Sequence, residues 1–77
     1  EMSIYPNPAK DEFFIKASSN ILGKVSVQIY DASGKLVSSQ KISSSDAVNT
    51  QALPNGVYIV KVEGLGVSYS SKLMIKK

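Results

Sequence analysis

The chain contains no cysteine, no histidine and no arginine among its 77 residues. Without cysteine, it has neither disulfides nor thiolate metal sites to supplement its core. Without histidine or cysteine, it also lacks the usual general base near neutral pH and the usual thiol nucleophile. Asp11 and Glu12 are adjacent, so on a strand they would point to opposite faces and would not act as a carboxylate pair. We therefore expect no enzymatic activity, no cofactor and no metal site.

The positive charge of the chain does not indicate a nucleic-acid partner. The net charge is +3, but the lysines are spread along the chain from Lys10 to Lys77. Arginine, the residue best suited to bidentate phosphate and guanine contacts, is absent. Asp31, Ser33 and Gly34 have a slight similarity to a calcium loop, but the repeated Asp or Asn and the closing Glu of such loops are missing. This segment predicts a hairpin turn instead.

The chain has no long apolar run. No segment approaches the roughly 20 apolar residues that a membrane-spanning helix needs, and the start lacks the charged and then apolar pattern of a signal peptide. The length predicts one small domain over residues 1–77. Because the sequence begins at Glu1, we expect it to be a piece of a longer exported protein; a complete cytosolic protein whose initiator methionine was removed is the alternative.

Alternation of apolar and polar residues is the main structural signal. From Val25 to Tyr30, Val and Ile occupy every second position, and segments 13–16, 57–62 and 72–76 show the same period of two. Turn signals separate these runs at short spacing. The pattern predicts an all-β, immunoglobulin-like antiparallel sandwich of about seven short strands. We expect these strands near residues 2–5, 12–17, 24–31, 35–41, 46–51, 56–63 and 67–76.

Turn residues carry specific structural expectations. Gly34 should supply a positive φ in a hairpin in which Asp31 accepts backbone N–H bonds, and residues 53–56 should form a similar turn. Gly56 should adopt a backbone conformation open only to glycine. Tyr58 should lie in the core with its hydroxyl on a backbone partner.

Four segments in order resemble a known family. They are Ile4–Ala9 followed by the strand at 13–15, the hairpin at 27–37, the strand at 53–62, and the final segment 72–76. Together they resemble the type A C-terminal sorting domain of the type IX (Por) secretion system of Bacteroidota. The resemblance implies a recognition segment for the translocon and a set of structural motif residues. The recognition residues are Lys72, Leu73, Met74, Ile75, Lys76 and Lys77. The structural residues are Pro6, Asn7, Pro8, Gly34, Gly56 and Tyr58.

The same resemblance implies how such a domain is used. A cargo N-terminal to the domain would wait in the periplasm while the domain engages the outer-membrane translocon. A sortase-like protease would then cut upstream, and the cargo would be anchored at the surface or released. We expect a monomer. The alternative is an accessory β-sandwich, fibronectin-like or carbohydrate-binding, in a secreted hydrolase. The lysines of the final segment are themselves open to a second interpretation, as protection of an edge strand against aggregation.

Overall fold

The structure is a computed structural model that describes residues 2–17, 23–64 and 66–77. Seven strands lie within these residues, joined by turns and loops. In chain order they are β1 (Met2–Tyr5), β2 (Glu12–Ala17), β3 (Lys24–Tyr30), β4 (Leu36–Ser43), β5 (Val48–Asn49), β6 (Gly56–Gly64) and β7 (Val67–Ile75). Across this part of the chain there is no helix of the length and hydropathy needed to cross a membrane.

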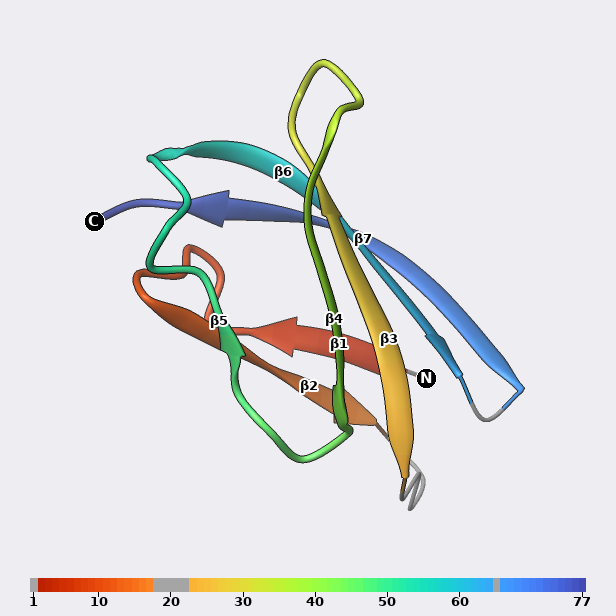
Figure 1. The fold of residues 1–77 in the computed structure, drawn as a ribbon. Coiled ribbons are helices and arrows are strands. Elements are labelled where there is room, and N and C mark those ends of the chain that lie inside the picture. The colour runs from red at the N-terminus through yellow and green to blue at the C-terminus, as the bar shows by residue number, and fades with distance from the viewer. Residues whose placement is uncertain (1, 18–22, 65) are drawn as a thin grey trace.

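The strands form two antiparallel sheets that face each other as layers (Figure 1). One sheet has the order β1-β2-β5 and the other the order β4-β3-β6-β7. The predicted all-β, immunoglobulin-like antiparallel sandwich is therefore confirmed. Strands β3 and β6 are central, whereas β7, the last strand, is at an edge of the larger sheet.

The core lies between the two sheets and follows from the alternation in the sequence. Val27 pairs with Val62 and Ile29 with Val60, and all four side chains are fully buried. The smaller sheet contributes Phe13, also fully buried, to the same cluster. Fully burying side chains of this size stabilises the fold by about 1.5–3 kcal/mol each. A domain of this size depends on such residues because its total core is small.

The predicted hairpin between β3 and β4 is confirmed. The Gly34 N–H donates to the Asp31 carbonyl at 3.0 Å, and the φ of Gly34 is +90°, in the left-handed region that favours glycine. Asp31 Oδ1 accepts the N–H groups of Ser33 and Lys35 at 2.9 and 3.0 Å. The local sequence was sufficient here because every one of these contacts lies within five residues.

Two predictions about the segment before β6 are wrong. Residues 53–56 do not join two paired strands, because β5 and β6 belong to different sheets and the segment crosses between them. The φ of Gly56 is outside the left-handed region. Instead, the ring of Tyr58 lies over Gly56, where an added Cβ would be 3.6 Å from the ring.

The fifth strand is also much shorter than the predicted 46–51, because only Val48 and Asn49 pair with β2. On one side, Asp46 forms a turn in which its N–H donates to the Ser43 carbonyl. On the other, the Thr50 N–H donates to the carbonyl of Asp11 at 2.7 Å, which continues the contact beyond the ladder. The Asp46 carboxylate also accepts the Ser43 N–H at 3.3 Å, so this turn limits the strand at one end.

Candidate functional site

Strand β7 is the element that the sequence analysis associated with recognition. It pairs antiparallel with β6 along its whole length, from Gly56 opposite Ile75 to Gly64 opposite Val67. Its other edge faces away from the sheet. An edge strand presents a row of unpaired N–H and C=O groups, which a protein must cover or protect.

The side chains of the final segment divide as the period of two predicts. Leu73 and Ile75 are buried in the core, whereas Lys72, Met74 and Lys76 are exposed. Successive side chains of a strand point to opposite faces, so the two buried residues hold the strand in place and the other three face outward. Alternate residues of a strand are about 6.7 Å apart, which sets the spacing of the exposed groups.

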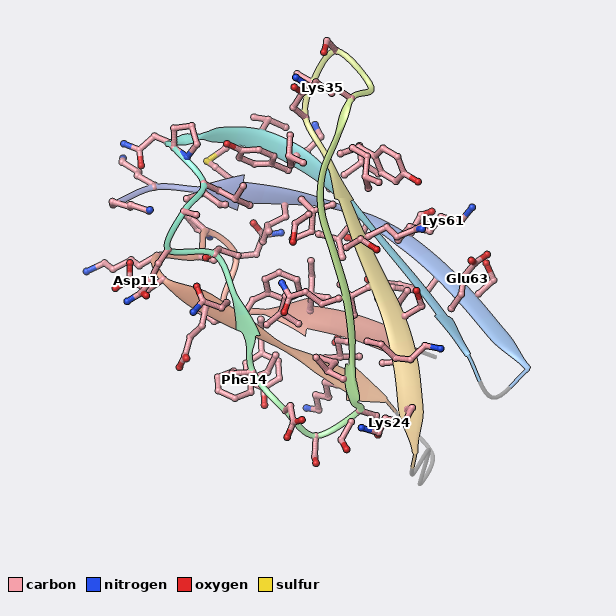
Figure 2. All side chains as sticks on the ribbon, viewed as in Figure 1. Asp11, Phe14, Lys24, Lys35, Lys61 and Glu63 are labelled. Atoms are coloured by element: carbon pink, nitrogen blue, oxygen red, sulfur yellow. The ribbon has the colours of Figure 1, made fainter. Side chains whose placement is uncertain are left out.

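The charges of the two exposed lysines are free of ion pairs within the described residues, where the single ion pair joins Lys61 to Glu63. Its Nζ and Oε2 atoms are 3.6 Å apart, and both side chains are about half exposed, so its contribution to stability is small. Figure 2 shows these two side chains close together on β6. Lys72 and Lys76 therefore present uncompensated positive charge on the outside of the sheet.

The side chain of Asn7 covers part of the outer edge of β7. Its Nδ2 donates to the Lys72 carbonyl at 3.0 Å, and the Met74 N–H donates to its Oδ1 at 3.0 Å. One amide side chain thus satisfies a backbone acceptor and a backbone donor two residues apart, as a neighbouring strand would. We call Asn7 and Ala9 together the N-terminal clasp.

Ala9 continues the clasp through its backbone. Its N–H donates to the Met74 carbonyl at 2.8 Å, and the Lys76 N–H donates to its carbonyl at 2.9 Å. These bonds make a parallel bridge between Ala9 and Ile75. Ala9 is fully buried. The clasp therefore covers the outer edge of β7 over residues 72–76.

The clasp was not predicted from the sequence. Pro6, Asn7 and Pro8 were expected to have structural roles, but without this contact to β7; β1 does end at Tyr5, directly before Pro6. A signal was nevertheless available, because an asparagine held between two prolines has a restricted backbone and a side chain that can both donate and accept. Its partner strand could not be identified from the sequence.

The last residue is held by separate contacts. The Lys77 N–H donates to Asn55 Oδ1 at 2.9 Å, and the Lys77 ammonium donates to the Gln51 carbonyl at 2.8 Å. This ammonium group is thus engaged within the domain, in contrast to those of Lys72 and Lys76. The structure brings the predicted residues 72–77 together in one strand and its extension, but gives Lys77 an intramolecular contact.

Tyr58 occupies the predicted core position. Its side chain is buried, and its hydroxyl donates to the Pro54 carbonyl at 2.6 Å, which confirms the expected backbone partner. This bond ties the crossing segment between the sheets to β6. Tyr58 is therefore a core residue whose hydroxyl is engaged within the domain.

The Asp31 carboxylate is committed to its own turn. Besides the two backbone donors, the Ser33 hydroxyl donates to Oδ1 at 2.6 Å. The bond from the Ser33 side chain, followed by that from the Lys35 backbone, lowers the pKa of Asp31 below its ordinary value of 3.8. Hydrogen bonds within the hairpin account for this shift, and no group of three acidic side chains gathers in the described residues to hold a metal.

Comparison with known proteins identifies the family. A search of curated proteins found no match to the chain. A family model described as "Secretion system C-terminal sorting domain" matches residues 3–76, nearly the whole chain. Such domains are sorting signals of type IX secretion and not enzymes; they imply an N-terminal cargo, contact with the secretion machinery, and export across the outer membrane to the cell surface or the medium. The chain, with its β-sandwich and clasped final strand, therefore belongs to the type IX secretion C-terminal sorting domain family.

Proposed function

We propose that this domain directs an N-terminal cargo through the type IX outer-membrane translocon by presenting residues 72–76 as its recognition surface. The cargo crosses the inner membrane by a separate signal and waits in the periplasm. After translocation, a sortase-like surface protease cuts upstream of the domain. The cargo is then anchored at the surface or released, and the domain itself performs no chemistry.

The observation that carries the proposal is the way in which β7 is held. The strand is fixed on one edge by β6 and on the other, over residues 72–76, by the N-terminal clasp, while Leu73 and Ile75 anchor it from below. Lys72, Met74 and Lys76 are the side chains that remain available to a partner on this strand segment. A rigid arrangement reduces the entropy that binding would otherwise cost.

The experiment compares two double charge reversals in the domain fused behind a reporter in a type IX secreting host. Lys72→Glu with Lys76→Glu reverses the charge of the proposed surface. Lys10→Glu with Lys16→Glu makes the same change of net charge at exposed positions in and before β2, on the other sheet. We expect the first variant to accumulate in the periplasm and the second to reach the surface or medium like the parent.

Folding of both variants is checked by circular dichroism, because exposed substitutions usually change stability by less than about 0.5 kcal/mol. If the folded Lys72→Glu, Lys76→Glu variant were exported at the parental level, these lysines would serve only to protect the edge strand against aggregation. If both variants were retained in the periplasm, export would depend on the net charge of the domain and not on a local surface.

A second candidate function is an accessory carbohydrate-binding module. The observation in its favour is a surface recess of about 680 Å³ whose lining residues include Phe14, Pro6, Pro8, Asp11 and Glu12. Figure 2 shows Asp11 and Phe14 on this side of the smaller sheet. Tyr5 stacks on the Phe14 ring, with centroids 5.6 Å apart. Titration with oligosaccharides tests this function, and micromolar binding abolished by Phe14→Ala would support it.

A further inference from the structure

The outer face of the larger sheet is divided into an apolar end and a polar end. At one end, cross-strand partners form a row over all four strands: Leu36 opposite Tyr30, Tyr30 opposite Ile59, and Ile59 opposite Lys72. Beside this row, Val57 is opposite Met74. Partners in an antiparallel register share a face, so these side chains lie together. We call Leu36, Tyr30, Ile59, Val57 and Met74 the apolar end.

The next two rows of the same face are polar throughout. The outward residues there are Ser39, Gln28, Lys61 and Ser70 in one row, and Lys41, Ser26, Glu63 and Ser68 in the other. Figure 2 shows Lys61 and Glu63 of these rows pointing away from the smaller sheet. The same four strands thus carry apolar outward residues at one end and polar ones at the other. Outward positions of these strands therefore accept polar residues, and the strand structure does not explain why one end is apolar.

The apolar end is exposed to solvent. Leu36, Val57, Ile59 and Met74 are each between 41 and 46% exposed. Single exposed apolar residues are ordinary in soluble proteins, but contiguous ones mark interaction surfaces. Because these residues lie in adjoining rows, they form a contiguous apolar surface of the kind that marks an interaction site.

Positive charge borders the apolar end. Lys72 lies in the row itself, Lys76 follows Met74 at the end of β7, and Lys35 precedes Leu36 in the hairpin. Among the described residues, none of the three has a carboxylate within ion-pair distance. The nearby carboxylate of Asp31 is bound within its own turn.

We infer that the apolar end is a docking surface for a folded protein of the export machinery whose contact surface has an apolar centre and a border of carboxylates. This inference rests on the proposed function and extends it, because recognition then involves β6, β3 and β4 besides the final strand. Charge complementarity selects the partner: a second copy of the domain would bring lysines against lysines. The row crosses four strands, so the partner binds the folded domain and not a linear tail.

The decisive comparison uses two double variants on the same strand and the same face. Val57→Thr with Ile59→Thr removes the apolar character but keeps the β-branched shape that strands favour. Lys61→Thr with Glu63→Thr is the matched control at the polar end, and it leaves the net charge unchanged. In the reporter fusion, we expect the first variant to lower the ratio of exported to periplasmic reporter at least fivefold and the control to stay within twofold of the parent.

A remote substitution tests whether the surface extends beyond β7. Leu36→Thr lies on β4, the opposite edge strand, and Lys41→Thr on β4 is its control. We expect Leu36→Thr to lower the export ratio and Lys41→Thr to leave it unchanged. Thermal unfolding of each purified variant identifies any loss of export caused by unfolding, and Leu36→Thr decides the question if the Val57→Thr, Ile59→Thr variant does not fold.

The outcomes separate this inference from the proposed function. If the parent domain does not export the reporter, the proposed function fails. If the parent is exported and Lys72→Glu with Lys76→Glu is retained, but the folded apolar variants are exported normally, only the inference fails, and recognition is confined to β7.

Two further measurements on the purified 77-residue chain address other occupants of this face. Sedimentation with phosphatidylglycerol and phosphatidylcholine vesicles tests a membrane, and light scattering tests self-association. We expect neither vesicle binding nor dimers. Vesicle binding or a dimer that is lost in the Val57→Thr, Ile59→Thr variant would overturn the assignment of a protein partner.

Discussion

Asn7→Ala should release the final strand from the clasp. The substitution removes the donor to the Lys72 carbonyl and the acceptor for the Met74 N–H. Each hydrogen bond contributes a net of about 0.5–1.5 kcal/mol. Both are solvent-exposed, so water replaces part of the loss and a destabilisation of about 1–2 kcal/mol is expected. For a domain of this size, that corresponds to a fall in melting temperature of about 4–16 °C.

Amide hydrogen exchange locates the effect within the strand. In Asn7→Ala, the Met74 N–H loses its acceptor and should exchange much faster. The Lys76 N–H keeps its bond to the Ala9 carbonyl and should change less. A melting temperature within about 2 °C of the parent, together with unchanged exchange at Met74, would refute the role assigned to Asn7.

The matched control is Asn55→Ala. Asn55 Oδ1 also accepts a backbone N–H, that of Lys77, but at the chain end beyond the strand. This variant should leave the exchange of the Met74 N–H unchanged. If the two asparagine variants affected Met74 equally, the clasp would have no special part in holding β7.

Three further predictions concern the core and the β3–β4 hairpin. Tyr58→Ala should destabilise the domain by about 3–5 kcal/mol through loss of a buried aromatic side chain. Tyr58→Phe loses only the bond to the Pro54 carbonyl and should destabilise it by about 1 kcal/mol. Thermal unfolding of both variants checks that Tyr58→Ala is the less stable of the two. The lowered pKa of Asp31 favours its ionised form in the fold, so its stabilising contribution is present above about pH 4 and is lost as the pH falls through the lowered pKa. Ser33→Ala should raise the pKa of Asp31 toward 3.8, and an NMR titration of the carboxylate that found no rise would contradict the assigned cause. Calorimetric titration with calcium should detect no binding, because Asp31 Oδ1 already accepts three hydrogen bonds, and micromolar affinity would disprove this reading of the turn.

The sequence predicted those features that depend on near neighbours along the chain. Alternation identified Val27, Val60 and Leu73 as inward residues because a strand places every second side chain on one face. The hairpin followed from Asp31 and Gly34, whose contacts are local. Gly56 was misjudged, because it is the packing of the Tyr58 ring, and not a turn conformation, that the structure shows at that position.

Features that depend on strand pairing were beyond the sequence. The bonds of Asn7 join residues 65 and 67 positions apart, and no local pattern indicates which strand the loop will meet. The apolar end likewise depends on the register that aligns Leu36, Ile59 and Lys72 across the sheet. Each of these residues alone is an ordinary exposed position, and only the register brings them together.

The clasp links recognition to folding. The final strand acquires its fixed edge only when the loop near the start of the domain reaches it, because the contacts of Asn7 and Ala9 close the sandwich along the edge of β7. Strands β1 and β7 belong to different sheets (Figure 1), and the loop after β1 brings Asn7 and Ala9 to β7. A chain lacking the loop would retain the lysines of residues 72–76 but would lose the partners that hold their spacing. A receptor that depends on this spacing, and on the apolar end beside it, would therefore distinguish a folded domain from an unfolded chain with the same terminal sequence.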